Sequence, residues 1–247
     1  MHTPSLAAGL FFLHNPKAGG TSVSLWLAQQ FSVEKRSPLV ENGAVDHANL
    51  AGRYDDFKGY DFYSGHYGRD LFDAVRTTHL PVTNFRNPVS RLTSLYNYFR
   101  VAVPETDEVM TSSRFACVQA AKQQSFETFL QNDDPRVSAY TRNHHTRQLT
   151  RSAWEWESDL AGAKALIDEM PWFYIAEEPD RSMAWATRWL GPGVANISRD
   201  NVTPDHAGKI GKISLDLEDL IFRFNQEDFA LYEYALARMT RLNGPAH

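Results

Sequence analysis

Residues 10–22, LFFLHNPKAGGTS, constrain the fold most strongly, because an apolar run leads directly into a glycine-containing turn. The apolar run predicts a buried strand, and the residues after the turn predict a helix. Gly19 and Gly20 allow the backbone to approach a ligand closely. The amides that open a helix point toward an anion and have the helix dipole behind them. The segment therefore predicts a phosphate-binding loop, to which Lys17 adds a positive charge.

A second segment, residues 81–99, repeats the order strand, turn and helix in PVTNFRNPVSRLTSLYNYF. Asn87 fits the N-cap of a helix, and the proline after it fits the first helical position. Arg86 lies just outside this helix, and Ser94 lies inside it, about 10 Å along an axis that rises about 1.5 Å per residue. The two turns together fit an adenosine ligand that carries two separate phosphate groups.

Both segments resemble the cofactor loops of sulfotransferases that use 3′-phosphoadenosine 5′-phosphosulfate (PAPS), in the carbohydrate branch that includes the heparan sulfate and uronosyl 2-O-sulfotransferases. HNPKAGGTS is similar to that branch's 5′-phosphosulfate loop, H-I-P-K-T-A-G-T-S, and FRNPVSRLTSLYNYF is similar to its 3′-phosphate segment, R-D-P-x-x-R-x-x-S-x-Y-Y-Y. Ala18 replaces the usual Thr, and Asn87 replaces the usual Asp. The resemblance implies cofactor contacts from Lys17, Ala18, Gly19, Gly20, Thr21, Ser22, Arg86 and Ser94.

Less specific matches extend the resemblance along the chain. Residues 63–68, YSGHYG, resemble the Gly-His stretch that carries the catalytic base in the uronosyl group, which implies that His66 is the base. Ser64 stands where the heparan sulfate enzymes have a second His, so His66 alone would have this role. Residues 143–150, NHHTRQLT, resemble an N-x-Q-T-R-x-L segment, and residues 172–191 resemble a strand, a glutamate and a helix that close the fold.

Sulfuryl transfer to a hydroxyl resembles phosphoryl transfer, in which the protein mainly positions in-line groups and neutralises charge. Lys17 would neutralise the departing 5′-phosphate, and no metal is required in principle. A neutral imidazole, with an ordinary pKa of about 6.5, suits proton removal from the acceptor, and His66 is the chosen residue. Arg86 and Ser94 would hold the 3′-phosphate, a group that ATP lacks, which favours PAPS as donor and adenosine 3′,5′-bisphosphate as product.

Several cations and histidines have two open interpretations. Arg91 either joins the 3′-phosphate site or makes a structural ion pair. His144 and His145 are the alternative bases or acceptor contacts. The arginines beside them form either a solvated helix face or a contact surface for an anionic acceptor or the cofactor; they are Arg142, Arg147 and Arg151.

Composition sets the broad class. A chain of 247 residues that is 43% hydrophobic buries a large core, and we predict one domain over residues 1–247. Its net charge of −5 disfavours nucleic-acid binding. No apolar run approaches the roughly 20 residues of a membrane span and none resembles a secretion signal, so a cytoplasmic location is predicted. The single cysteine, Cys117, excludes an internal disulfide, and its flanks predict a buried helical thiol.

The hydrophobic pattern predicts an α/β fold with a parallel sheet flanked by helices, and the resemblance implies the P-loop-NTPase-like sulfotransferase fold. Strands are expected at residues 10–14, 60–64, 81–85, 172–176 and 194–198. Helices are expected at residues 21–31, 69–77, 88–101, 125–131, 155–169, 179–190 and 226–242, and loops at 102–113 and 199–213. The apolar stripe of the last helix, Phe229, Tyr232, Leu236 and Met239, predicts core packing. Tyr96, Tyr98 and Phe99 are expected to pack their helix against the sheet.

Three functions remain. The first is a PAPS-dependent sulfotransferase that acts on a hydroxyl of a small-molecule or carbohydrate acceptor. The second is a P-loop kinase or NTPase, which is disfavoured because the chain lacks the Gly-Lys-Ser/Thr triplet of a Walker A loop and an evident Walker B acid. The third is a catalytically silent protein that binds adenine nucleotides. The loops leave the acceptor and the oligomeric state open, because acceptor surfaces are made by variable loops.

Overall fold

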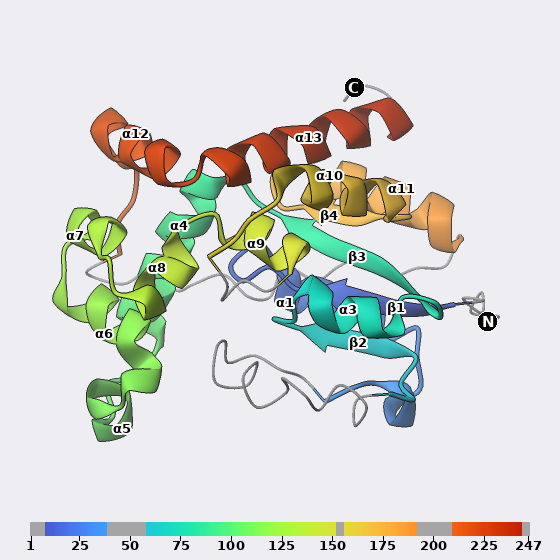
Figure 1. Ribbon diagram of the computed structural model, residues 1–247, viewed down its shortest axis with the longest axis horizontal. Helices are drawn as coiled ribbons and strands as arrows, with labels where there is room; N and C mark the ends of the chain where they lie inside the picture. Colours follow the sequence, from blue (N-terminus) through green and yellow to red (C-terminus); the bar gives the residue numbers. More distant parts are fainter. Residues whose placement is uncertain (1–7, 39–57, 152–155, 192–208, 244–247) are drawn as a thin grey trace.

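The structure is a computed structural model that describes residues 8–38, 58–151, 156–191 and 209–243 (Figure 1). Its described residues form a four-stranded parallel sheet in the order β2-β1-β3-β4. The strands are β1 (Gly9–Leu13), β2 (Phe62–Gly65), β3 (His79–Phe85) and β4 (Phe173–Ile175). The α/β class and the flanked parallel sheet are confirmed, with these strands close to their expected positions. The expected strand at 194–198 lies outside the described residues.

Helices follow the strands along the chain. Those around the sheet are α1 (Gly20–Ala28), α3 (Arg69–Val75), α9 (His144–Thr150), α10 (Leu160–Glu169), α11 (Pro179–Leu190) and α13 (Gln226–Asn243). Those beside it are α4 (Pro88–Asn97), which continues into the π-helical turn η3 (Tyr98–Ala102), α5 (Asp107–Thr111), α6 (Ala116–Gln123), α7 (Phe126–Gln131), α8 (Pro135–Thr141) and α12 (Leu215–Phe224). Two short 3₁₀ turns, η1 (Val33–Lys35) and η4 (Ser113–Phe115), complete the set in the described ranges.

The expectation of a loop over residues 102–113 is wrong in its centre, where α5 forms. Thr106 caps this short helix, because its side chain accepts a hydrogen bond from the Val109 amide. The expected helix at 155–169 begins only at Leu160, after the Asp159 side chain has accepted from the Gly162 amide. Both helices begin after a polar N-cap residue that lies among other polar residues, so the cap is hard to recognise in the sequence.

The order in which the chain adds strands reverses between β1 and β3, although all four strands are parallel. The chain leaves β1 for its neighbour β2 on one side, and leaves β3 for β4 on the other. Right-handed crossovers then place α1 and α3 on opposite faces of the sheet, and Figure 1 shows α3 in front of it. In open α/β sheets, ligands bind at the carboxyl ends of the strands where the order reverses. The turns after β1 and β3 are therefore the expected place for a site.

The core has two clusters. The first surrounds the sheet and contains Trp172 and Trp185; the second lies among α4, α6, α7, α8 and α12, to one side of the sheet in Figure 1. Tyr96 belongs to the second cluster and contacts Phe126, so the expectation that it packs against the sheet is wrong. Periodicity identifies the buried face of a helix but not its neighbour, and here the neighbours are α6 and α7.

The helix α13 bridges both clusters, and Figure 1 shows it passing from α12 over α10. Tyr232 and Met239 are buried in the sheet cluster, whereas Phe229 borders the second one. The predicted core packing of this helix is confirmed. Cys117 is buried in α6, where burial raises the pKa of its thiol well above the usual value, as expected for a structural cysteine. Within the described part of the chain, no helix has the length and apolarity needed to cross a membrane.

Candidate functional site

The turn after β1 contains two residues with positive φ, at the position where the sequence predicts a phosphate-binding loop. Lys17 and Gly19 both lie in the left-handed region, with φ of 64° and 78°. A side-chain-bearing residue adopts this conformation rarely, and such positions cluster at functional sites. The first hydrogen bond of α1 joins the Val23 amide to the Gly19 carbonyl at 3.4 Å. The amides of the first residues of α1, which are Gly20, Thr21 and Ser22, therefore have no acceptor within the helix.

Gly20 packs so closely that no side chain fits there. An added Cβ atom would lie 2.0 Å from Cδ2 of His14 and 2.9 Å from Nδ2 of Asn84. The glycine thus brings the start of α1 against the end of β1.

Asn84 holds the loop together from the centre of the sheet. This fully buried side chain donates from Nδ2 to the carbonyls of Asn15 (2.9 Å) and Ala18 (3.0 Å), and its Oδ1 accepts from the Asn15 amide at 2.8 Å. Ala18 is also buried, and its carbonyl is engaged by Asn84. Asn84 is not among the residues predicted from the sequence, although a polar residue inside an apolar strand is a signal, because buried amides need partners.

The two predicted anion-binding segments meet at the switch point of the sheet. Arg86 donates from Nη1 to the carbonyl oxygen of Lys17 at 3.1 Å. The Lys17 Nζ atom lies 3.8 Å from the centroid of the Tyr98 ring, and the Tyr98 amide donates to the Ser94 carbonyl one turn earlier. Burial, followed by the charge of Arg86, lowers the pKa of Lys17 to about 8. The structure therefore brings Lys17 to Arg86 and to Tyr98, which lies one helical turn after Ser94.

Glu177, which follows β4, supports the turn after β3. Both carboxylate oxygens lie 3.2 Å from the Asn87 amide, and Oε2 accepts from the Tyr232 hydroxyl at 3.2 Å. Oε1 lies 4.0 Å from Nε of Arg86. Burial lowers the pKa of Arg86 and Glu177 partly offsets this. The predicted N-cap is confirmed, since Oδ1 of Asn87 accepts from the Val89 amide at 2.9 Å.

His66 follows β2 at the same edge of the sheet. Its ring centroid lies 4.8 Å from that of His14, which directly follows β1 and stacks on Phe12. Burial, with the charges of His66 and Lys17, lowers the pKa of His14 well below the usual value, so His14 is neutral. Ser64, two residues before His66, bonds through Oγ to Ser24 Oγ at 2.5 Å.

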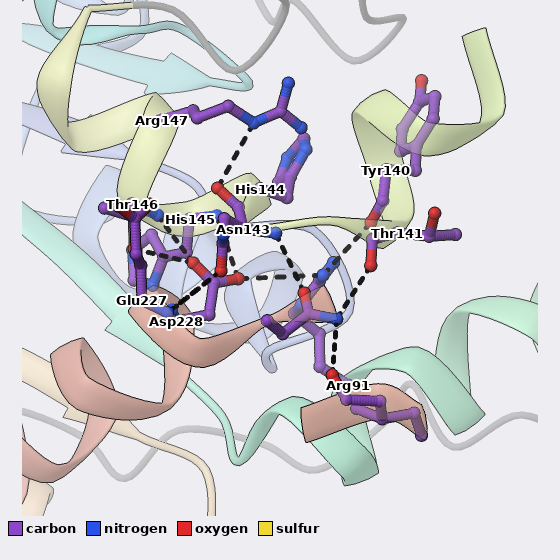
Figure 2. A network of polar contacts seen from close by, with 12 residues as sticks. Arg91, Tyr140, Thr141, Asn143, His144, His145, Thr146, Arg147, Glu227 and Asp228 are labelled. Carbon is purple, nitrogen blue, oxygen red and sulfur yellow. Dashed lines mark hydrogen bonds and ion pairs between the residues drawn. The ribbon is translucent and has the colours of Figure 1, made fainter. Parts of the chain in front are cut away.

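The histidine pair of α9 is buried within the fold (Figure 2). Nε2 of His145 lies 3.2 Å from Oγ1 of Thr83, and burial lowers the pKa of this imidazole to about 3. Nδ1 of His144 lies 2.8 Å from the Ala139 carbonyl. Both imidazoles are therefore buried and have partners within the protein, and their role as alternative bases or acceptor contacts stays a prediction.

The arginines near α9 do not share one solvated face. Arg147 is buried and donates from Nη2 to the Ala139 carbonyl at 2.6 Å, and burial lowers its pKa to about 10. Arg142 instead pairs with the exposed Asp133 at 2.6 Å, and only Arg151 is exposed. The solvated-face interpretation is therefore wrong for Arg147, because α9 lies inside the fold.

The helices α9 and α13 cap each other through a network of polar contacts, which Figure 2 shows. Asn143 accepts through Oδ1 from the Glu227 and Asp228 amides at the start of α13, each at 3.2 Å. Asp228 accepts in return from the Thr146 amide and hydroxyl of α9, each at 2.8 Å. Arg91, only 1% exposed, places Nη2 3.9 Å from Asp228. Of the two interpretations of Arg91, the geometry favours the structural ion pair.

No protein-family model matches the chain, and a search of curated proteins finds no similar sequence. Among the described residues, no group of three or more His, Cys, Asp and Glu side chains is placed to hold a metal ion.

Proposed function

We propose that this protein is a PAPS-dependent sulfotransferase with the P-loop-NTPase-like sulfotransferase fold, which transfers a sulfuryl group to a hydroxyl of a carbohydrate or other small-molecule acceptor. The hydrogen bond from Arg86 Nη1 to the Lys17 carbonyl, at 3.1 Å, is the observation that carries the proposal. It brings two anion-binding turns to one switch point, where a ligand with two separate anionic groups can use both.

The turn after β1 fits the 5′-phosphosulfate. The amides of Gly20, Thr21 and Ser22 open α1 without acceptors inside the helix, and this end of the helix has a positive dipole. Lys17 adds a charge that is partly buried, where electrostatic interactions are stronger than in water. Ala18 would contribute through the shape of the loop, since Asn84 occupies its carbonyl.

The turn after β3 fits the 3′-phosphate. Arg86 would bind it by charged hydrogen bonds, and the Ser94 hydroxyl would add a further contact from the helix. Glu177 lies 4.0 Å from Nε of Arg86 and would help to orient the guanidinium. ATP has no 3′-phosphate, so it would leave this arginine without its anionic partner.

Two side chains would act in the reaction. When bound, PAPS supplies the sulfuryl group and a phosphate leaving group. Lys17 would stabilise the negative charge that grows on the leaving oxygen, which makes its contact stronger in the transition state than in the ground state. His66 would accept the proton of the acceptor hydroxyl at its imidazole, and it lies at the carboxyl edge of the sheet next to β1. The protein otherwise positions the groups in line.

Calorimetric titration of the full chain with adenosine 3′,5′-bisphosphate and with ATP tests the proposal. We expect the bisphosphate to bind about tenfold tighter or better, because a charged hydrogen-bonding partner distinguishes the two ligands. Transfer of labelled sulfate from PAPS to a panel of saccharides and small hydroxylated compounds tests the chemistry. Preference for ATP with phosphate transfer would instead favour the kinase alternative, and bisphosphate binding without transfer to any acceptor would favour the silent binding protein.

A further inference from the structure

Gln148 of α9 bridges the ends of two neighbouring strands. Its fully buried side chain donates from Nε2 to the carbonyl of His14 at 3.0 Å and to the carbonyl of Tyr67 at 2.8 Å. At the ends of these two strands, a backbone hydrogen bond joins the His14 amide to the Gly65 carbonyl at 3.0 Å. Beyond this bond, the Gln148 side-chain amide links the two segments in place of a further backbone hydrogen bond between strands.

The two carbonyls belong to the two halves of the proposed site. His14 precedes Lys17 in the turn after β1, and Tyr67 immediately follows His66 in the turn after β2. The rings of His14 and His66 lie 4.8 Å apart beside this bridge. A single nitrogen atom thus ties the backbone of the phosphate loop to the backbone of the proposed base.

The Gln148 side-chain amide has one possible orientation, and the helix α9 that carries it is held by contacts with other segments. Rotation of the Gln148 amide would place its oxygen against two carbonyl oxygens, so the hydrogen bonds determine which atom is the nitrogen. Within the described residues its Oε1 atom has no hydrogen-bond partner, so the side chain serves as a double donor. The helix that carries it is held by Asp228 at its start and by Thr83, which contacts His145.

We propose that Gln148 is a positioning residue, which sets the separation between the His66 imidazole and the phosphate loop that contains Lys17. This inference rests on the proposed function for the roles of these two side chains. Rate depends steeply on such a separation, because reacting groups must be held in near-attack geometry. Loss of the bridge should therefore reduce turnover while the cofactor loops keep their contacts.

A matched pair of variants isolates this role. Gln119 of α6 also donates from Nε2 to two backbone carbonyls, those of Val109 and Ser112, each at 2.8 Å. Replacement by Met keeps the length of either side chain and removes both donors. Gln148→Met and Gln119→Met lose the same chemical group, but only the first lies beside the proposed site.

For Gln148→Met we expect kcat for sulfate transfer to fall about 10- to 100-fold, with the Kd of adenosine 3′,5′-bisphosphate changed by less than about threefold. Gln119→Met should leave both values near those of the wild type. Unchanged kcat in Gln148→Met, or an equal fall in Gln119→Met, would overturn the inference. If Gln148→Met does not fold, Gln148→Glu keeps the side-chain shape and should show the same fall in kcat.

A second readout does not depend on sulfotransferase activity. The His66 ring protons are followed by NMR through a pH titration, with assignment from His66→Ala. We expect their chemical shifts or their titration midpoint to move in Gln148→Met and to stay in place in Gln119→Met. An unchanged His66 signal in Gln148→Met would overturn the positioning role. Failure of the wild type to bind the bisphosphate would overturn the proposed function alone, and the NMR comparison would still decide the role of Gln148.

Discussion

Arg86 donates from Nη1 to the carbonyl oxygen of Lys17 at 3.1 Å, so the turn after β3 directly supports the turn after β1. The same guanidinium lowers the pKa of the Lys17 ammonium through charge repulsion, in addition to the larger effect of burial. An anion bound between these cations relieves their repulsion. The two turns should therefore respond together to a ligand.

Arg86→Ala should weaken binding of adenosine 3′,5′-bisphosphate by about 2 to 4 kcal/mol, because a charged partner of the 3′-phosphate is lost. Adenosine 5′-phosphosulfate should lose only about 0.5 to 1.5 kcal/mol, which is the usual value of the hydrogen bond to the Lys17 carbonyl. Calorimetry measures both losses. Arg100→Ala, which removes an arginine bound to the Ala121 carbonyl, is the control and should affect neither ligand. Equal losses for the two ligands would contradict the assignment of Arg86.

Binding of adenosine 3′,5′-bisphosphate should weaken as pH rises through about 8, the pKa of Lys17 in the free protein. The protonated amine is the form that attracts the anion, so affinity is highest below this pKa and falls above it. Above this pKa, the affinity for the bisphosphate should fall by nearly tenfold per pH unit if binding requires the charged form of Lys17. Lys17→Arg stays charged and should abolish the slope, and calorimetry over a pH series measures it. A slope that persists in Lys17→Arg would place the titrating group elsewhere.

Lys17→Ala should lower kcat more than it raises the Kd of the cofactor, because the charge is most favourable when the leaving oxygen becomes negative. Saturation kinetics with PAPS, combined with calorimetry of the bisphosphate, separates the two effects. Unchanged turnover at saturation would mean that Lys17 binds the cofactor without stabilising the transition state.

His66→Ala should leave bisphosphate binding close to normal and lower kcat by about 10² to 10⁴, the usual range for a positioned general base. In the wild type kcat should rise with pH as the base loses its proton, and this limb should vanish in the variant. His145→Gln is the control, since its buried imidazole contacts Thr83 and its pKa of about 3 keeps it neutral. A large loss of kcat in the control with near-normal turnover in His66→Ala would reverse the assignment.

Asp228→Ala should reduce the free energy of unfolding by about 3 to 5 kcal/mol, because Arg91 is left as an unpaired buried charge and the start of α9 loses its acceptor. Asp133→Ala removes the exposed ion pair with Arg142 and should cost about 0 to 1 kcal/mol. Urea unfolding followed by circular dichroism compares the two. Similar losses would show that the buried network does not hold α9 and α13 together.

Features that depend on residues close together in the chain can be predicted from the sequence alone. The apolar runs before the two turns predicted the parallel strands β1 and β3, because both faces of a parallel sheet are buried. Asn87 and the proline after it predicted the start of α4, and the periodic stripe of the last helix predicted its core face. Caps and periodicities involve residues a few positions apart, so they can be recognised without knowledge of the fold.

Contacts between groups far apart in the chain depend on how the strands and helices are arranged in space. Asn84, Glu177 and Gln148 support the site through contacts with segments far away in the sequence. Tyr96 packs on α7, contrary to expectation, and the burial of Arg147 excludes the solvated face that was one of its two interpretations, because local pattern does not specify the neighbour of a helix face. The physical reason is that Asn84, Glu177 and Gln148 form hydrogen bonds with backbone groups of the turns after the strands, which have no partner within their own strand or helix. Their partners exist only once the order β2-β1-β3-β4 brings those groups together.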